Sequence, residues 1–303
     1  MQSFFSDTPW FVPEWPAPVQ VRALCTTRHG GFSAVPFDSL NLGDHVGDDP
    51  KAVAANRQRL QDAIAAFSSI APMEFLQQVH GTEVAALDKG NLSASSLRAD
   101  ACVATQLGKV CTIMVADCLP VLLTNQQGST VAAAHAGWRG LAGATGNADM
   151  ASSGQGVVES VLESFWAADR LQRAPAAVKN KLLEASFNLC AAQAADTLAW
   201  LGPCIGPQAF EVGPEVRAAF CDHIAAAVQH FQPAGAGSTG KYLADLAGLA
   251  RQRLRAAGVT QIYGNDSTPR WCTVGNPSRF YSHRRDSVRL GSSGRFAVCI
   301  WRD

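Results

Sequence analysis

Residues 99–134 read ADACVATQLGKVCTIMVADCLPVLLTNQQGSTVAAA and carry the strongest structural signal in the chain. Turn residues separate four short apolar runs in this stretch, at 101–105, 110–116, 120–124 and 129–134. The runs lack the alternation of polar and apolar side chains that marks a strand with one face in water. They therefore predict the strands of a sheet that is buried on both faces.

The flanking sequence contains further segments typical of strands and of helices. Pro50 follows Asp48 and Asp49, an arrangement that favours a helix start at this point. The apolar spacing predicts helices at 51–66, 157–171, 177–201, 214–231 and 242–258. Further strands are expected at 19–27, 73–80, 82–87, 259–264 and 295–301. Loops are expected at 144–156 and 233–240, after an irregular arm at 1–17.

These elements predict one α/β domain over residues 1–303. The length allows one or two domains at about 150 residues each, but no shift in composition marks a boundary between two. The sequence also lacks a repeat at the periods of solenoids or propellers. The Ala-rich region near 144–200 is mostly helical in character, and we expect it to be an insertion in this single domain.

Composition excludes several classes of protein. Hydrophobic residues make up 47% of the chain, as in globular proteins. Lys plus Arg and Asp plus Glu both number 25, so there is no charge excess typical of general binders of nucleic acid or anionic membranes. No apolar run is long enough for a membrane span. The N-terminus lacks a secretory pattern, and the nine Cys form no CxxC pair, which together predict a cytoplasmic protein with free thiols.

Three segments place a metal-capable side chain where an apolar strand runs into a turn. They are QQVHG with His80, VADCLPV with Cys118, and AAAHAGWRG with His135. Two imidazoles and a thiolate suit Zn²⁺, and three protein ligands leave a fourth position for water or substrate. The spacing is long and irregular, however, so a hydrogen-bonded core histidine and an inert buried cysteine remain the alternative at this point.

Two residues adjoin this set. Asp117 could orient a ligand histidine or act as a base, or it could cap a local turn. Arg139 could clamp an anion through its guanidinium fork, or it could be a surface arginine stacked on Trp138.

Other loops offer weaker candidates. Arg28 precedes two glycines in TTRHGGFS, where backbone amides could approach an anionic oxygen, but an ordinary tight turn has the same pattern. Cys204 in GPCIGP could be a nucleophile, or its Gly and Pro neighbours could only shape a bend. Arg284 in FYSHRRD belongs to a basic group that could equally be a solvated turn.

Taken together, these segments resemble the laccase-domain family, also labelled multicopper polyphenol oxidase and described as zinc-dependent purine nucleoside phosphorylases. The matching pieces cover most of the chain and occur in this order: TTRHGGFS, NLGDHVGDDP, QQVHGTEV, ADACVAT, ADCLPVLL, AAHAGWRG, GPCIGPQAFEVG, KYLADLAGLARQRL, WCT, FYSHRRD and SGR. The resemblance implies an α/β/β/α-type sandwich of layered sheets and helices. It also implies that His80, Cys118 and His135 are zinc ligands.

The resemblance further implies phosphorolysis of adenosine, inosine, guanosine and methylthioadenosine, with adenosine deamination as a second activity. Purine nucleosides and phosphate would be the partners. We expect Arg28 to contact phosphate or substrate, with Asn41, Arg139 and Arg284 as further substrate contacts, and Asp117 to shuttle a proton. The chain departs from the family pattern in the extra material within 141–200 and in His283, where Tyr is frequent.

Three alternatives remain. A copper-dependent polyphenol oxidase would use the same ligand types with Cu²⁺, although the chain has seven His and no HxH pair for a multicopper cluster. A metal-free hydrolase would use Cys118 as nucleophile and His135 as base. A non-enzymatic binding protein would use the Ala-rich helices for partner contacts. The oligomeric state is left open by the sequence.

Overall fold

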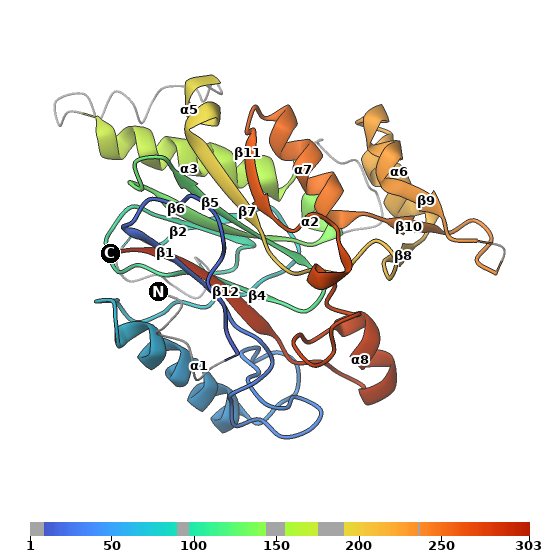
Figure 1. Ribbon diagram of the computed structural model, residues 1–303, viewed down its shortest axis with the longest axis horizontal. Coiled ribbons are helices and arrows are strands. Elements are labelled where there is room, and N and C mark those ends of the chain that lie inside the picture. Colours follow the sequence, from blue (N-terminus) through green and yellow to red (C-terminus); the bar gives the residue numbers. More distant parts are fainter. Residues whose placement is uncertain (1–8, 90–96, 144–154, 175–190, 236) are drawn as a thin grey trace.

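The computed structural model describes residues 9–89, 97–143, 155–174, 191–235 and 237–303. These residues form four layers, in which two sheets pack face to face and helices cover the outer face of each sheet (Figure 1). The predicted α/β/β/α sandwich is therefore confirmed.

The larger sheet has six strands in the order β11-β7-β5-β6-β3-β2. The pairs β2–β3 and β7–β11 are parallel, and the other neighbours are antiparallel. The four inner strands are buried on both faces, as the apolar runs predict. The strands are β2 (Val84–Ala86), β3 (Ala101–Ala104), β5 (Leu119–Asn125), β6 (Val131–Ala136), β7 (Thr197–Leu201) and β11 (Gln261–Gly264).

The smaller sheet has the order β1-β12-β4 and is antiparallel throughout. Its strands are β1 (Val21–Cys25), β12 (Phe296–Arg302) and β4 (Cys111–Val115). The four apolar runs of 101–134 therefore do not share one sheet, because β4 pairs with the distant strand β12 instead of with β3 or β5. Burial on both faces looks the same in sequence whichever sheet a strand joins, so the run alone could not specify its partner.

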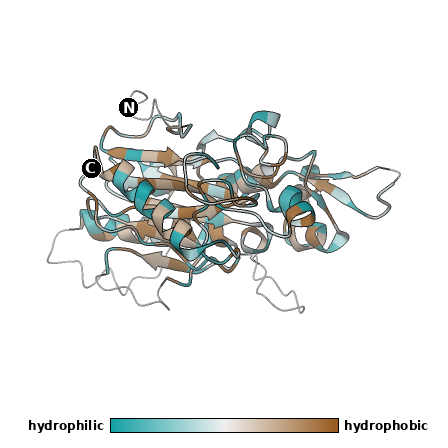
Figure 2. Cartoon of the chain, turned by 90° about the horizontal axis from the view of Figure 1, so that it is seen from below, coloured by the Kyte–Doolittle hydropathy of each residue, from teal (hydrophilic) through white to brown (hydrophobic). Residues whose placement is uncertain are grey.

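Apolar side chains fill the space between the sheets and beneath the helices. Figure 2 shows the hydrophobic residues gathered on the strands in the interior. Helix α1 (Pro50–Ala65) packs Leu60 and Ile64 against the smaller sheet. Helices α3 (Val157–Arg173) and α7 (Leu246–Ala256) cover the outer face of the larger sheet. The helix predicted after Asp49 is confirmed, since Asp49 caps it and accepts a hydrogen bond from the Lys51 amide.

Short elements surround one end of the sandwich. A third small sheet has the order β8-β10-β9. The remaining elements are α2 (Trp138–Ala142), α5 (Ala191–Asp196), β8 (Glu211–Val212), α6 (Pro214–Cys221), η3 (Ala225–His230), β9 (Phe231–Pro233), β10 (Tyr242–Ala244), η4 (Pro269–Trp271) and α8 (His283–Leu290).

Three expected elements are wrong in part. The end of the helix expected at 177–201 is strand β7, because Thr197–Leu201 pairs with β5 on one side and β11 on the other. The helix expected at 214–231 stops at Cys221, and its remainder forms η3 and β9. The helix expected at 242–258 starts only after strand β10. There Asp245 caps α7 by accepting a hydrogen bond from the Gly248 amide.

The region expected to be an insertion contains part of the core. Helix α3 buries Phe165 and Trp166 against the larger sheet, and β7 is an inner strand of that sheet. Residues 144–154 and 175–190, which include most of the expected loop and the start of the expected helix, lie outside the described residues.

A substitution distinguishes a core helix from a dispensable insertion. Phe165→Ala should lower the free energy of unfolding by about 3–5 kcal/mol, because it leaves a cavity in a fully packed layer. Urea denaturation measures the loss, with the half-buried Glu163→Ala on the same helix as the control. A loss below about 1 kcal/mol would show that α3 contributes little to the fold.

Candidate metal centre and its pocket

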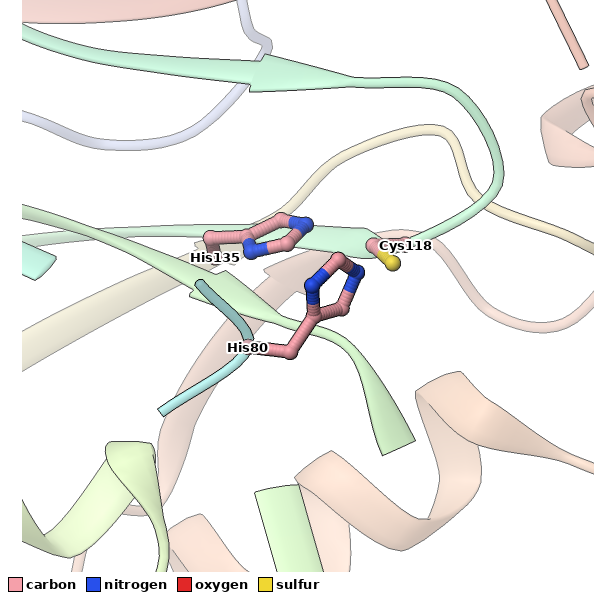
Figure 3. Close-up of side chains that lie close together, drawn as sticks. All are labelled: His80, Cys118 and His135. Atoms are coloured by element: carbon pink, nitrogen blue, oxygen red, sulfur yellow. The ribbon is translucent and has the colours of Figure 1, made fainter. Parts of the chain in front are cut away.

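Hydrogen bonding between β5 and β6 brings two of the predicted ligands together. Pro120 pairs with His135, so Cys118, just before β5, lies beside the end of β6. His80 approaches from the loop before β2. Figure 3 shows the three side chains pointing toward one another. One potential ligand atom from each residue lies within 4.8 Å of the others, which makes this the predicted metal-capable set.

The segment carrying His80 is not the strand expected at 73–80. It forms no strand, and among the described residues side-chain hydrogen bonds supplement the single backbone bond from the Gln77 amide to the Leu97 carbonyl (2.8 Å). The Gln78 side chain donates to the Met114 carbonyl (2.8 Å) and accepts from the Met114 amide (2.8 Å). His80 itself has a φ of 62°, a left-handed conformation that is uncommon for a residue other than glycine and that clusters at functional sites.

Asp100 connects this segment to His135. Its carboxylate accepts hydrogen bonds from the amides of Val79 (3.1 Å), His80 (2.8 Å) and Gly81 (2.6 Å). The same carboxylate lies 2.9 Å from Nδ1 of His135. Because an ionised carboxylate only accepts, Nδ1 carries the proton and Nε2 is left as the ligand atom. One buried carboxylate thus orients two of the three candidate ligands.

The electrostatics of the set favour an ionised Asp100 and a thiolate. Burial raises the pKa of Asp100, but its hydrogen bonds and the His135 ring outweigh burial and lower it. Burial likewise raises the pKa of Cys118, but the adjacent His135 and His80 lower it to about 6. Burial lowers the pKa of His135, but Cys118 and Asp100 outweigh burial and raise it to about 9. A thiolate is the form of cysteine that binds metal.

Glycine at position 137 permits the close approach of these side chains. A Cβ atom at Gly137 would lie 2.9 Å from Sγ of Cys118 and 3.0 Å from Cδ2 of His80. Both distances are shorter than ordinary van der Waals contact. The glycine of the AAAHAGWRG segment therefore leaves room for the ligand set.

The three residues line a pocket of about 410 Å³, a volume in the usual range for small-molecule sites. Its other lining residues are His45, Gln78, Met114, Ala116, Asp117, Trp138, Arg139, Ile205, Phe210, Leu246, His283, Arg284 and Arg295. Burial and the charge of Arg295 lower the pKa of both His45 and His283, so both are neutral at pH 7. Outside the ligand set, the cationic residues of the described lining are therefore its three arginines.

Asp117 lines the pocket but does not orient a ligand histidine, a role that Asp100 has instead. Its φ is 87°. One carboxylate oxygen accepts from Thr273 Oγ1 (2.5 Å), and the other accepts from Ser282 Oγ (3.0 Å) and the Arg284 amide (2.6 Å). Since Ser282 caps α8, Asp117 fixes the start of that helix beside the pocket.

The structure does not bring Arg28 and Asn41 into the pocket lining. Arg28 donates to the carbonyl and carboxylate of Asp38 and to the Pro277 carbonyl, so its guanidinium holds loops together. Asn41 acts indirectly, because its side-chain oxygen accepts from the backbone amide of Arg295 (2.8 Å). The partners of Arg28 are distant in sequence or belong to the backbone, which a local motif does not reveal.

Arginines line the pocket in three different settings. Arg139 is exposed and stacks on Trp138 with 4.5 Å between the guanidinium carbon and the ring centre. Arg284 lies on α8, where its side chain donates to the Glu211 carbonyl (3.0 Å). Arg295 donates to the carbonyls of Ser293 (2.7 Å) and Gly294 (3.2 Å) and has no carboxylate partner within the described parts of the chain.

Sequence reasoning missed Asp100 and Arg295. Asp100 stands directly before the buried strand β3. A carboxylate at the start of an apolar run is a signal that could have marked it. Arg295 was visible only as the last residue of the SGR piece. Cys204, by contrast, is buried, and burial raises its pKa well above the ordinary value, which favours the bend over the nucleophile.

A family model described as multi-copper polyphenol oxidoreductase laccase matches residues 22–163 and 174–303. The chain belongs to this family. Besides residues 1–21, the match omits ten residues, 164–173, which lie in the second half of α3 and within the region where extra material was expected. All three candidate ligands of this laccase-family chain lie within the matched ranges.

Relatives of this laccase-family chain have similar lengths. It is 43% identical over 293 residues to a purine nucleoside phosphorylase of Pseudomonas aeruginosa, covering 96% of this chain and 98% of that protein. It is also 43% identical over 290 residues to purine nucleoside phosphorylase YfiH of Escherichia coli, covering 96% and 97%. A crystal structure of a Neisseria meningitidis protein of the DUF152 family matches with a TM-score of 0.73 and 37% identity, covering 97% and 99%.

No helix among the described residues combines the length and apolar character that crossing a membrane requires.

Proposed function

We propose that this chain is a zinc-dependent purine nucleoside phosphorylase. It would convert adenosine, inosine, guanosine or methylthioadenosine and phosphate to the free base and the ribose 1-phosphate product. The observation that carries the proposal is the set of His80, Cys118 and His135 in an arginine-lined pocket. The names of the relatives in Pseudomonas aeruginosa and Escherichia coli support the same activity.

The donor set fits zinc. His80, Cys118 and His135 would hold the ion, with two imidazole nitrogens and a thiolate as its ligands, and Asp100 would fix the orientation of His135. A bound Zn²⁺ supplies Lewis acidity to the pocket without any change of oxidation state. Only one group of three or more metal-capable side chains occurs among the described residues, whereas a multicopper oxidase needs several. This count favours zinc chemistry over the copper oxidase.

The reaction needs an anion site and a route for a proton. An oxygen of hydrogen phosphate attacks C1′ as the bond from C1′ to the purine nitrogen breaks, and the departing base takes the bonding electrons and the proton that the phosphate gives up. The protein accelerates this step by holding the two reactants in line and by stabilising charge on the base. Asp117 is the single carboxylate among the described lining residues, so we assign the movement of the proton to it.

We assign phosphate binding to Arg295 first, with Arg139 and Arg284 as further contacts. Arg295 has no competing carboxylate partner in the described parts of the chain, and its backbone is positioned by Asn41. A partly buried guanidinium gives a charge-assisted hydrogen bond worth about 1.5–3 kcal/mol. The expectation that Arg28 contacts phosphate is tested in the same experiment.

Arg295→Gln should raise the KM for phosphate by roughly 10–100-fold, which corresponds to the loss of one charge-assisted contact. Arg28→Gln should leave this KM within about twofold and lower thermal stability instead, since Arg28 bonds to Asp38 and Pro277. Initial rates at varied phosphate concentration measure both. The reverse result would transfer the phosphate contact to Arg28.

The test of the function is chromatography of adenosine incubated with the purified, zinc-loaded protein, with and without phosphate. Adenine and ribose 1-phosphate that form only with phosphate would support the proposal. Inosine formed without phosphate would add adenosine deamination as a second activity of the same pocket. A folded, zinc-loaded sample that yields no product from any of the four nucleosides would contradict the proposal.

One observation favours the hydrolase as a second candidate. In space, the carboxylate of Asp100 lies 2.9 Å from His135, which would be the base, and Cys118, which would be the nucleophile, lies next to His135. A hydrolase of this kind would keep its turnover of amides or esters in the presence of a chelator. Phosphorolysis that a chelator abolishes and added zinc restores would exclude this candidate as the main activity.

A further inference from the structure

A second cavity of about 400 Å³ lies apart from the metal pocket, and the two share no lining residue. It forms where the N-terminal arm crosses the ends of β7 and β11. Its walls include the aromatic rings of Trp10, Phe11, Trp200, Trp271 and Phe280. The function proposed above gives this cavity no task.

The aromatic walls contain hydrogen-bond donors without acceptors. The indole nitrogens of Trp200 and Trp271 are buried, and neither has a hydrogen-bond partner among the described residues. The two rings meet edge to face with their centres 5.9 Å apart. A buried indole N–H usually finds an acceptor, since leaving one unpaired costs about 1–3 kcal/mol. Because both nitrogens are buried, they lie behind the cavity surface, and the groups that face a ligand are the aromatic rings and the charged side chains of the lining.

Arg279 adds a positive charge to the same cavity. Its guanidinium carbon lies 5.2 Å from the ring centre of Phe11 and 5.0 Å from that of Phe280. The side chain is exposed and forms no ion pair within the described parts of the chain. Arg270, across the cavity, has Asp266 at 3.6 Å. Arg279 is thus the cation of this cavity that remains available to an anion.

The wall from the N-terminal arm is fixed in place. Phe11 exchanges two backbone hydrogen bonds with Cys25 of β1, at 3.0 and 2.8 Å. This pairing extends the edge of the smaller sheet and holds the Phe11 ring next to Arg279. The cavity is therefore a formed site with flat aromatic walls, a cationic end at Arg279 and one carboxylate in its lining, Glu14.

We propose that this cavity binds a planar heteroaromatic anion of the nucleoside monophosphate type. The aromatic walls suit a flat base that stacks on them, and Arg279 suits the phosphate. The volume falls within the range of small-molecule sites. The proposal concerns binding alone and does not depend on the function proposed for the metal pocket.

The test is a titration of the metal-loaded, full-length protein with adenosine monophosphate, followed by tryptophan fluorescence. Trp138 lines the metal pocket, so the Trp138→Phe variant removes the nearby reporter there and leaves those of the second cavity. We expect saturable quenching in that variant. Arg279→Gln in the same background should weaken binding at least tenfold, whereas Arg59→Gln, an exposed arginine stacked on Phe32, should change nothing.

Two further ligands separate the contribution of the nucleoside part to binding from that of the phosphate. Adenosine should bind more weakly than its monophosphate, and inorganic phosphate alone should not quench. Trp271→Leu removes one aromatic wall and keeps an apolar side chain, so it should weaken binding several-fold even if Arg279→Gln fails to fold. The proposal is overturned if quenching disappears with Trp138→Phe, or if both Arg279→Gln and Trp271→Leu bind the nucleotide as the parent does.

Discussion

Cys118→Ser should lower the affinity for zinc by more than about 100-fold and remove phosphorolysis with it. Loss of a group that only orients a ligand costs about 10–100-fold in metal affinity, and loss of a ligand itself costs more. Cys118 is also the one thiolate donor of the set, next to His80 and His135. Metal content after desalting and the rate of adenine formation are the two readouts.

Cys221→Ser provides the matched control. Cys221 is half-buried on α6 and does not line the pocket, and burial raises its pKa. The control should keep both its zinc and its turnover. If Cys118→Ser retained stoichiometric zinc and full activity, neither the assigned ligand set nor its role in the reaction would stand.

Asp100→Asn should have the second largest effect, a fall of roughly 10–100-fold in metal affinity. The amide cannot accept from all the donors that the carboxylate serves, which are three backbone amides and Nδ1 of His135. An NH₂ group turned toward Val79–Gly81 would repel the loop that carries His80. Competition with a chromophoric chelator measures the affinity.

Asp88→Asn separates a site effect from a general loss of stability. Asp88 is a similar clamp away from the pocket, accepting from the Thr105 amide (2.8 Å), its hydroxyl (2.7 Å) and the Gln106 amide (3.1 Å). We expect Asp88→Asn to lower the melting temperature without changing metal affinity. Equal losses of metal affinity in both variants would mean that Asp100 acts only through the stability of the fold.

The elements that could be predicted are those whose cause is local. Helix α1 follows from Asp49, Pro50 and an apolar period within the helix itself. Strand β7 could not be separated from the preceding Ala-rich sequence, because its pairing partners β5 and β11 lie more than 50 residues away. The assignment of β4 to the smaller sheet was hidden for the same reason. Local propensity yields to such long-range pairing.

The site residues divide in the same way, into those with a local sequence signal and those placed by contacts with distant residues. His80, Cys118 and His135 were candidates because each stands at a turn after or before an apolar run. The resemblance to a known family selected them over ordinary core residues, and the structure brings their side chains together. Asp100 contacts them from 20 and 35 residues away, and no local pattern records that contact. Arg28 was expected in the site from its glycine neighbours, yet Asp38 and Pro277 hold it elsewhere.

Two of the three candidate metal ligands belong to backbone that the pairing of β5 with β6 fixes without any ion. In small zinc domains the ion itself drives folding, and chelators unfold them. A preorganised set of this kind lets the apoprotein stay folded, so metal can be exchanged in the native state. Occupancy then depends on which ion is supplied and on the affinity order of nitrogen and sulfur ligands. Samples of one sequence prepared with copper or with zinc would differ in chemistry while sharing the same fold.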